Sequence, residues 1–325
     1  MRAGPVLRSP PSGPRCTKGR SVRGSAGRLR KVPRARSRDS SDHESTSVDA
    51  RLPIYPRAVT SVGLIGGGRM GSALLGGLLD AGWDADDLAV AEVDAERRRE
   101  LEQQFPKVRV VPSPAWAVAD ADVVVVAVKP GDVTASLQAA ESSLRSETLV
   151  LSIAAGVKIE TLEPLVPGRP VVRAMPNTPA LVGLGASAIA PGRHAQDRHL
   201  DLAARLLGAV GIVVRVSETA LDAVTGLSGS GPAYVFLVAE ALIEAGVLEG
   251  LPRDVSERLV VQTLLGSATL LAQSEEGPEA LRAAVTSPGG TTAAGLRELE
   301  SARLRAAILD AVGAATRRSR ELGEQ

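Results

Sequence analysis

From residue 60 to about residue 216, short apolar runs alternate with longer stretches that space their apolar side chains three or four residues apart. The short runs predict strands, and the spaced stretches predict amphipathic helices. The predicted strands occupy residues 61–65, 88–91, 108–111, 123–128, 149–153, 171–173 and 212–216. Strands that alternate with helices along a chain are typical of a mostly parallel, doubly wound α/β sheet.

Beyond residue 217 the strand patterns stop, and long helical patterns rich in Ala, Leu and Val fill the rest of the chain. The pattern therefore predicts two folded domains, an α/β domain over residues 58–216 and an all-helical domain over residues 217–325. The helical domain has no sheet to cover its apolar faces. We expect it to bury one of them against a second copy of the chain.

The charge distribution separates the first 57 residues from the rest. They carry fourteen Lys or Arg and four Asp or Glu, whereas the remainder carries 24 basic and 33 acidic residues. Residues 1–38 are rich in Pro, Gly and Ser and lack apolar periodicity, so we expect residues 1–57 to form a disordered basic extension. It is an arm for nucleic acid or another anionic surface, a targeting segment, or an upstream extension from a misplaced start codon. We favour the last.

The composition narrows the class of protein. Two Trp, two Tyr and two Phe leave little for base stacking, and the acidic folded body is not expected to bind nucleic acid. The single cysteine, Cys16, excludes an intramolecular disulfide and a thiolate metal site. The apolar stretch after Pro232 is interrupted by Glu240 and Glu244, so no membrane span is expected. These features favour a cytoplasmic protein without a metal.

A glycine-rich turn follows the first predicted strand. Gly66-x-Gly68-x-x-Gly71 leaves that strand and opens a helix, which is the context of a dinucleotide-binding turn. Gly66 permits the tight turn, Gly68 lets the backbone approach a pyrophosphate, and Gly71 allows close packing of helix on strand. The pattern predicts NADPH or NADH as cofactor. FAD sites share it, so a flavin is a lesser alternative, and a turn that binds nothing is another.

The second predicted strand ends at an acid, Glu92, about 20 residues after the last glycine, where it could accept hydrogen bonds from the adenosine ribose and repel a 2′-phosphate. Arg69 and the arginines at 97–99 favour NADPH instead, because one of them could hold that phosphate. The alternative for residues 97–99 is a solvated helix face paired with neighbouring glutamates. The choice between NADH and NADPH stays open.

Three residues, Val128, Lys129 and Pro130, close the fourth predicted strand at the carboxyl edge of the sheet. Open α/β sheets bind their ligands at this edge. The alternative is an ordinary turn between a strand and a helix.

Five stretches together resemble the pyrroline-5-carboxylate reductase family, over about residues 60–320. They are Ile65-Gly-Gly-Gly-Arg-Met-Gly71, Ala127-Val-Lys-Pro130, Arg173-Ala-Met-Pro-Asn-Thr-Pro179, Leu227-Ser-Gly-Ser-Gly-Pro-Ala-Tyr234 and Val285-Thr-Ser-Pro-Gly-Gly-Thr-Thr292. The last is the most specific of them. The resemblance implies an N-terminal Rossmann domain, a helical dimerisation domain, and NAD(P)H-dependent reduction of 1-pyrroline-5-carboxylate to L-proline, the final step of proline biosynthesis.

The resemblance also implies roles for individual residues. Thr292 is the expected catalytic residue, its hydroxyl facing the ring nitrogen of the substrate. The expected binders of the substrate are Ser287, Gly289, Gly290, Thr291 and Ser230. The expected cofactor contacts are Gly66, Gly68, Arg69, Met70, Gly71, Glu92, Val128, Lys129, Pro130 and Asn177. Larger rings of dimers occur in the family, and the size of the assembly stays open.

The Ser-Pro-Gly-Gly-Thr-Thr segment has a physical interpretation without the family. It is a helix N-terminus preceded by glycines, whose successive amides could form a nest for a carboxylate. An ordinary Ser or Thr helix cap is the alternative. Two rival functions remain: a relative in the same superfamily that reduces another keto or imino acid, and a dinucleotide sensor whose basic arm binds nucleic acid.

Two further features qualify the resemblance. His43, His194 and His199 lie outside all five stretches, and we expect all three at the surface. Reduction of a protonated imine needs no histidine acid, because the iminium carbon is already electrophilic. Between the last two helices, where the family leads us to expect a glycine pair, the chain has Glu300-Ser-Ala-Arg-Leu-Arg305, which puts the geometry of that loop in doubt.

Overall fold

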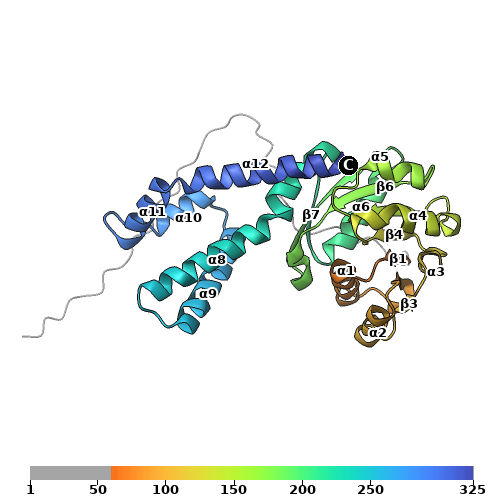
Figure 1. Ribbon diagram of the computed structural model, residues 1–325, viewed down its shortest axis with the longest axis horizontal. Helices are drawn as coiled ribbons and strands as arrows, with labels where there is room; N and C mark the ends of the chain where they lie inside the picture. Colours follow the sequence, from red (N-terminus) through yellow and green to blue (C-terminus); the bar gives the residue numbers. More distant parts are fainter. Residues whose placement is uncertain (1–59, 325) are drawn as a thin grey trace, which may run out of the picture. The chain divides into compact units, whose positions relative to one another are not determined.

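The computed structural model describes residues 60–324, and its sheet is the doubly wound sheet that the sequence predicts (Figure 1). Eight strands lie in the order β3-β2-β1-β4-β5-β6-β7-β8. They are β1 (Val62–Ile65), β2 (Leu88–Ala91), β3 (Arg109–Val111), β4 (Val123–Val126), β5 (Leu149–Ser152), β6 (Val171–Met175), β7 (Gly185–Pro191) and β8 (Gly211–Arg215). The first six run parallel, and β7 turns antiparallel against β6.

Strand β7 is absent from the sequence prediction. Its residues, Gly-Ala-Ser-Ala-Ile-Ala-Pro, include a single β-branched side chain, and alanine is depleted in strands. The strand forms because it lies between β6 and β8 and pairs with both. Tertiary pairing here overrides local propensity.

Helices cover both faces of the sheet. The α/β region contains α1 (Arg69–Asp80), α2 (Ala95–Gln104), α3 (Pro114–Val118), α4 (Val133–Ala140), α5 (Ile159–Leu162) and α6 (Asp197–Gly208). Alternate residues of the central strands face opposite sides. Leu64 of β1 joins a core with Leu74 of α1 and Leu206 of α6, whereas Ile65 joins a second core with Leu137 of α4 and Leu162 of α5. The two cores hold the carboxyl ends of β1, β2 and β4 in register.

Only helices follow β8 among the described residues. They are η6 (Glu218–Ala220), α7 (Leu221–Val224), the π-helix η7 (Thr225–Gly229), α8 (Gly231–Leu248), α9 (Arg253–Gln273), α10 (Pro278–Ala284), α11 (Thr291–Ser301) and α12 (Leu304–Gly323). The sheet thus ends at Arg215 and the helices begin at Glu218, close to the predicted domain boundary at residue 217. The described residues, 60–324, belong to one compact unit by contacts, and the predicted division at residue 217 stays a prediction. The predicted basic extension, residues 1–57, lies outside the described residues.

Helices α7 and η7 pack closely against α12. Asp222 accepts a hydrogen bond from the Ser319 hydroxyl at 2.7 Å between the two oxygens. A Cβ added at Gly226 would lie 2.8 Å from the Val312 carbonyl oxygen and would overlap the Thr316 hydroxyl. The close approach requires glycine at position 226. It fixes where the π-helix lies along α12.

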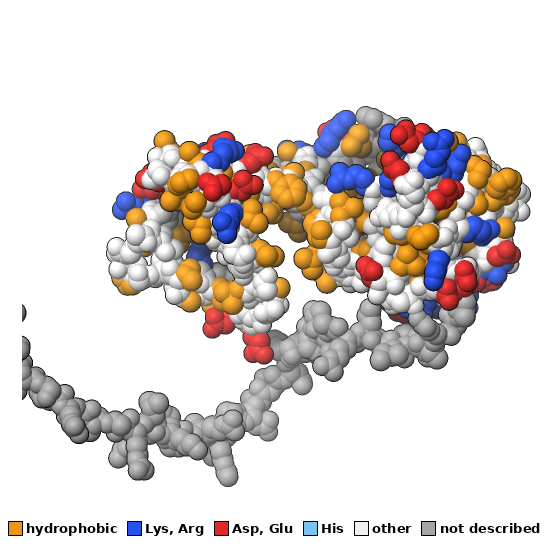
Figure 2. All heavy atoms as spheres, turned by 90° about the horizontal axis from the view of Figure 1, so that it is seen from below, with side chains coloured by type: hydrophobic (Ala, Val, Ile, Leu, Met, Phe, Trp, Pro, Cys, Tyr) orange, Lys and Arg blue, Asp and Glu red, His pale blue; other side chains and the backbone are white. Residues whose placement is uncertain are grey.

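Helices α8 and α9 pair with each other but leave apolar side chains at the surface. Gly246 of α8 faces Ser256 of α9, whose hydroxyl donates to the Ile243 carbonyl at 2.9 Å. The exposed large apolar side chains on these two helices are Val235, Phe236, Leu237, Val238, Leu242, Val247, Leu248, Val255, Leu259, Val261, Leu265, Leu270 and Leu271. Hydrophobic side chains are visible on the helical region in Figure 2. The helical stretch Glu218–Leu248 is long and apolar enough to cross a membrane by length and composition alone, which is weak evidence of a span.

The loop between α11 and α12 adopts a left-handed turn at Arg303, with φ 60° and ψ 34°. Arg303 is the single non-glycine residue with positive φ among residues 60–324. A non-glycine residue adopts these left-handed angles at a cost in backbone strain.

Candidate active site

The glycine turn between β1 and α1 has two glycines that the backbone requires. Gly66 has φ 107°, and an added Cβ would lie 2.8 Å from the Ala127 carbonyl oxygen. An added Cβ at Gly71 would overlap the Gly66 carbonyl oxygen. Both positions are closed to side chains by the fold itself, as the sequence predicted for a tight turn and close helix packing.

Gly68 differs from its neighbours. Its φ of −66° suits any residue, and within residues 60–324 no atom lies within 4 Å of the place a Cβ would take. The open space lies at the N-cap of α1, and no side chain of the described residues caps that helix. A free helix N-terminus beside an open space is the geometry that accepts a phosphate group.

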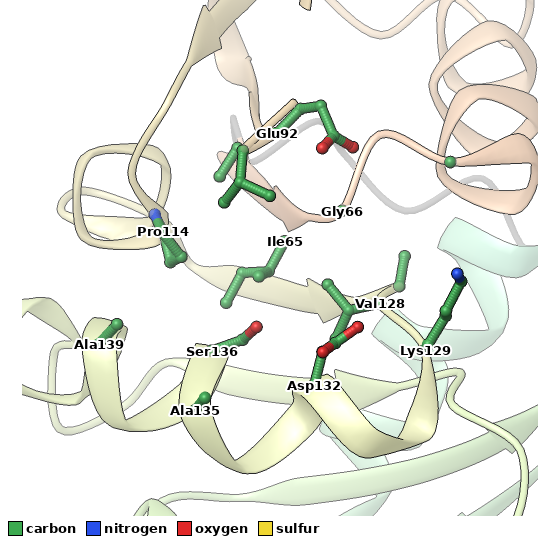
Figure 3. Close-up of a pocket in the computed structure, with 14 residues that line it drawn as sticks. Ile65, Gly66, Glu92, Pro114, Val128, Lys129, Asp132, Ala135, Ser136 and Ala139 are labelled. Atoms are coloured by element: carbon green, nitrogen blue, oxygen red, sulfur yellow. The ribbon is translucent and has the colours of Figure 1, made fainter. Parts of the chain in front are cut away.

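A cavity of about 470 Å³ opens at the carboxyl ends of β1, β2 and β4 (Figure 3). Of the predicted cofactor residues, Gly66, Gly68, Glu92, Val128 and Lys129 line it. The sequence prediction missed other lining residues, among them Val93, Pro114, Asp132, Ser136 and Ala139. Asp132, Ser136 and Ala139 recur every three or four residues, so the helical period would have indicated a common face once α4 was placed beside the turn. The cavity joins polar groups at the turn to an apolar wall.

Glu92 lies directly after β2, with its carboxylate turned toward the glycine turn (Figure 3). One oxygen accepts a hydrogen bond from the Gly67 amide and the other from the Asp94 amide, each at 3.0 Å. The carboxylate therefore fixes the turn that the cofactor would approach. It is more than a surface acid.

The arginines of α2 form the solvated face that we considered only in part, since Arg99 is exposed but Arg97 and Arg98 bond to the turn and to the end of β2. Arg97 pairs with Glu100 at 2.6 Å, but its guanidinium also donates to the Gly67 carbonyl at 2.8 Å and to the Ser72 hydroxyl at 2.6 Å. Arg98 donates to the Glu92 and Val93 carbonyls, both at 2.8 Å. Two of the three arginines thus hold the backbone around the turn.

The other predicted cofactor residues lie around the cavity without lining it. Arg69 lines a separate cavity of about 500 Å³ together with Arg97 and Ser72. Met70 packs against the core, and Pro130 starts the short helix η2 (Pro130–Asp132). Their roles as cofactor contacts stay predictions.

Asn177, which follows β6, uses its side-chain amide within the protein. Its nitrogen donates to the carbonyl and hydroxyl oxygens of Ser228 at 3.2 Å each, and its oxygen accepts from the Ala186 amide at 2.8 Å. Ser228 belongs to the π-helix η7, and Ser230 caps the following helix α8. Asn177 therefore links the end of β6 to the segment that leads to Ser230.

In the Ser-Pro-Gly-Gly-Thr-Thr segment, residues 287–290 form the loop before α11, with Gly290 as N-cap, and Thr291 and Thr292 begin the helix. No side chain of the described residues caps it, so the structure contradicts the ordinary Ser or Thr cap that we considered. The first helical hydrogen bond runs from the Ala294 amide to the Gly290 carbonyl at 3.2 Å. The amides of Thr291 and Thr292 precede that bond and have no partner in the helix.

Glycine is required at two positions in this loop. Gly289 has φ 71°, and an added Cβ at Gly290 would overlap the Ser287 hydroxyl. The Gly290 amide itself donates to the Ser287 carbonyl at 3.0 Å, which closes the turn. The structure thus brings Ser287, Gly289, Gly290, Thr291 and Thr292 together at one helix N-terminus.

The prediction for the histidines was wrong for His199, which is 8% exposed. It lies in the first turn of α6, where its Nδ1 accepts a hydrogen bond from the Gln196 amide at 2.9 Å. Burial lowers the pKa of His199 below its ordinary value of 6.5, and the neighbouring Arg198 acts in the same direction. His194 is exposed, and His43 lies outside the described residues. Within residues 60–324 no three His, Cys, Asp or Glu side chains are grouped to hold a metal.

A doubly wound sheet, a glycine turn with open space at its helix N-terminus, and an acid after β2 define a Rossmann-type NAD(P)H oxidoreductase. Family profiles agree: residues 61–156 match "NADP oxidoreductase coenzyme F420-dependent", and residues 218–322 match "Pyrroline-5-carboxylate reductase dimerisation".

Curated relatives extend the match over most of the chain. A pyrroline-5-carboxylate reductase of Synechocystis is 44% identical over 265 residues, which cover 81% of this chain and 98% of the relative. A pyrroline-5-carboxylate reductase of Mycobacterium tuberculosis is 46% identical, and the match covers 80% of this chain and 96% of the relative. The chain belongs to the pyrroline-5-carboxylate reductase family.

Solved structures agree with that assignment. A pyrroline-5-carboxylate reductase of Coxiella burnetii superposes with a TM-score of 0.78 at 35% identity, over 82% of this chain and all of that one. The Plasmodium falciparum enzyme, solved with NADP bound, superposes with a TM-score of 0.72 at 32% identity, over 81% of this chain and 98% of that one.

Proposed function

We propose that this protein reduces 1-pyrroline-5-carboxylate to L-proline with NADH or NADPH, as the last step of proline biosynthesis. The observation that carries the proposal is the uncapped N-terminus of α11 beside Ser287, in a chain that belongs to the reductase family. Successive free amides with glycines before them suit a carboxylate. The substrate carries one carboxylate and one imine.

The cofactor would lie along the cavity beside Gly68, with its pyrophosphate at the N-terminus of α1. When bound, the reduced nicotinamide supplies a hydride to the imine carbon. The ring nitrogen carries a proton when the substrate arrives as the iminium, so the residues need only position the ring. Product formation leaves that proton on the proline nitrogen.

Within the proposed site, each residue of the α11 loop has a task. The amides of Thr291 and Thr292 and the Ser287 hydroxyl would bind the carboxylate, held in place by the turn at Gly289 and Gly290. The Thr292 hydroxyl would contact the ring nitrogen and fix the imine carbon at the nicotinamide. Thr292 is half-buried, which limits its rotamers without closing it to a ligand. Ser230, at the start of α8, would complete the substrate contacts.

The experiment measures loss of reduced-nicotinamide absorbance with 1-pyrroline-5-carboxylate, and with a 2-keto acid as control substrate. Thr292→Ala should lower kcat/KM about tenfold or more, and Thr292→Ser should keep most of it, because the hydroxyl is retained. The matched control is Thr161→Ala, an exposed threonine on α5. Equal rates for wild type and Thr292→Ala would remove the assigned role, and turnover of the keto acid alone would favour the other superfamily reaction.

We also propose that the active form is a soluble cytoplasmic homo-oligomer. The apolar side chains on α8 and α9 are exposed in a single chain, and the helical region matches a dimerisation profile. A second copy would cover those side chains, including the apolar stretch Glu218–Leu248. Purification without detergent as a dimer or a multiple of one would support this assembly.

A further inference from the structure

The end of β2 is the part of a dinucleotide cavity that meets the 2′ position of the adenosine ribose. In this chain the residues there are Glu92, Val93 and Asp94. Glu92 and Val93 line the cavity (Figure 3). The positions after β2 thus carry two carboxylates and no cation.

Three backbone amides close to this place are already used by carboxylates of the protein. The Asp94 amide donates to Glu92 at 3.0 Å, and the Arg97 amide donates to the Asp94 carboxylate at 2.7 Å. The Gly67 amide donates to the second oxygen of Glu92. Asp94 therefore caps the start of α2, and its negative charge, with that of Glu92, opposes an incoming phosphate.

Two of the nearby arginines, Arg97 and Arg98, do not replace those amides. Arg97 is held by the Gly67 carbonyl, the Ser72 hydroxyl and Glu100, and Arg98 is held by two backbone carbonyls. Neither lines the cavity. Lys129 lines it but follows β4, next to the glycine turn rather than after β2.

We infer that this protein uses NADH in preference to NADPH, and that Glu92 is the residue that determines the preference. The inference rests on the proposed function for its reaction, but not for its binding step. The Glu92 carboxylate accepts hydrogen bonds from a ribose 2′-hydroxyl and repels a 2′-phosphate, and Asp94 adds to the repulsion. The preference is a departure from the NADP-bound Plasmodium falciparum structure.

The test compares the two cofactors in the same preparation. With the full-length protein, kcat/KM for NADH should exceed that for NADPH by at least about tenfold at saturating 1-pyrroline-5-carboxylate. Dissociation constants of NADH and NADPH, from nucleotide fluorescence without substrate, should differ in the same direction. Equal values, or a preference for NADPH, would overturn the inference.

Two variants assign the preference to its residue. Glu92→Gln should lower the ratio of kcat/KM for NADH to kcat/KM for NADPH about threefold or more, mainly through tighter NADPH binding. The substitution removes the negative charge and keeps an acceptor for the Gly67 amide. Val93→Arg keeps Glu92 and adds a cation at a side chain that is 78% exposed, so the variant should fold. It should also lower the ratio of kcat/KM for NADH to kcat/KM for NADPH, because the cation attracts a 2′-phosphate. The matched control is Glu96→Gln, an exposed acid of α2 that does not line the cavity.

The outcomes separate the two proposals. Selective binding of NADH without turnover of the imine would refute the proposed reaction and leave the preference intact. Turnover with equal use of both cofactors would refute the preference and leave the reaction intact. An unchanged ratio in both Glu92→Gln and Val93→Arg would show that these positions do not set it, and absence of binding by either nucleotide would refute the site.

Discussion

At the scale of single residues, the three glycines of the turn are required for different reasons. Gly68→Val should leave the fold and the melting temperature unchanged, because its backbone angles suit any residue and the space beside it is open. It should abolish binding of the reduced cofactor, since the side chain would occupy the space of the pyrophosphate. Thermal unfolding and nucleotide fluorescence measure the two effects.

The control for Gly68→Val is Gly71→Val in the same turn. Its side chain would meet the Gly66 carbonyl oxygen, so it should destabilise the fold by about 2 kcal/mol or more. A Gly68→Val protein that still binds NADH with wild-type affinity would show that the phosphates lie elsewhere.

The buried His199 predicts a pH dependence of stability. Burial lowers its pKa in the folded state below 6.5, so the unfolded chain takes up a proton first as the pH falls. The stability contributed by neutral His199 is complete above pH 6.5 and is lost as the pH falls toward the folded pKa. His199→Asn should remove the part of the loss that occurs as the pH falls below 6.5, measured by urea unfolding at a series of pH values. Identical profiles for wild type and His199→Asn would contradict the assignment.

The residues of the site were predictable from the sequence where one residue type serves a local backbone need. Gly66 and Gly71 are examples, because the turn itself excludes side chains. Arg97 was not predictable, since its bond to the Gly67 carbonyl joins residues 30 positions apart, and a solvated helix face explains the same pattern of charges. His199 was misjudged because burial of a polar side chain depends on a local hydrogen bond, here from Gln196, that apolar periodicity does not encode.

At the scale of secondary-structure elements, the π-helix η7 and helix α12 meet with no space between them. Gly226→Ala should destabilise the protein by about 1–3 kcal/mol, because the new methyl group meets the Val312 carbonyl and the Thr316 hydroxyl. The loss should also reduce kcat/KM, since Ser230 follows this segment. Gly231→Ala, where the added carbon meets open space, is the control for denaturant unfolding. Equal stabilities of Gly226→Ala and Gly231→Ala would mean that η7 and α12 separate readily.

In the turn between α11 and α12, a substitution is expected to stabilise the protein. Arg303→Gly should raise the free energy of unfolding by about 0.5–1 kcal/mol, because glycine adopts the left-handed angles without the Cβ penalty. Ala302→Gly, at φ −75°, should give no gain. Urea midpoints of the two variants compare them directly, and a loss of stability in Arg303→Gly would show that the arginine side chain makes a contact worth more than the strain.

Most elements were predictable because their sequences carry a strong period. The predicted runs at residues 88–91, 123–128 and 149–153 coincide with β2, β4 and β5 within two residues. Strand β7 was not predictable, since its alanines do not favour a strand until β6 and β8 lie on either side. The π-helix was also beyond the sequence prediction, because its residues, Thr-Gly-Leu-Ser-Gly, include two glycines, which disfavour a helix until the segment packs against α12.

At the scale of the whole molecule, the exposed apolar side chains of α8 and α9 predict self-association. Phe236→Asp places a charge on a side chain that is 63% exposed in the single chain and that a second copy would bury. The variant should shift the protein from dimer to monomer in light scattering and lower its activity. Trp116→Asp, at a 61% exposed aromatic of α3, should leave the mass unchanged. A dimeric Phe236→Asp protein would place the interface on another surface.

The sequence predicted a sheet followed by helices because strands and helices have different hydrophobic periods. It predicted the need for a second copy for a related reason: the region after β8 has apolar helices and no sheet to cover them. The hydrophobic period of one chain does not determine the contacts between chains. It therefore does not predict which side chains are covered or how many copies assemble.

The strand order has a consequence for the chain as it is synthesised. β1 lies between β2 and β4, so one of its edges stays unpaired until Val123–Val126 has left the ribosome. At ordinary rates of translation the stretch between the two strands takes roughly 3–12 s to emerge. During that interval the glycine turn exists without the strand that forms the far wall of its cavity. Slower translation across residues 66–122 should therefore lower the yield of native enzyme, while a faster rate shortens the exposure of that edge.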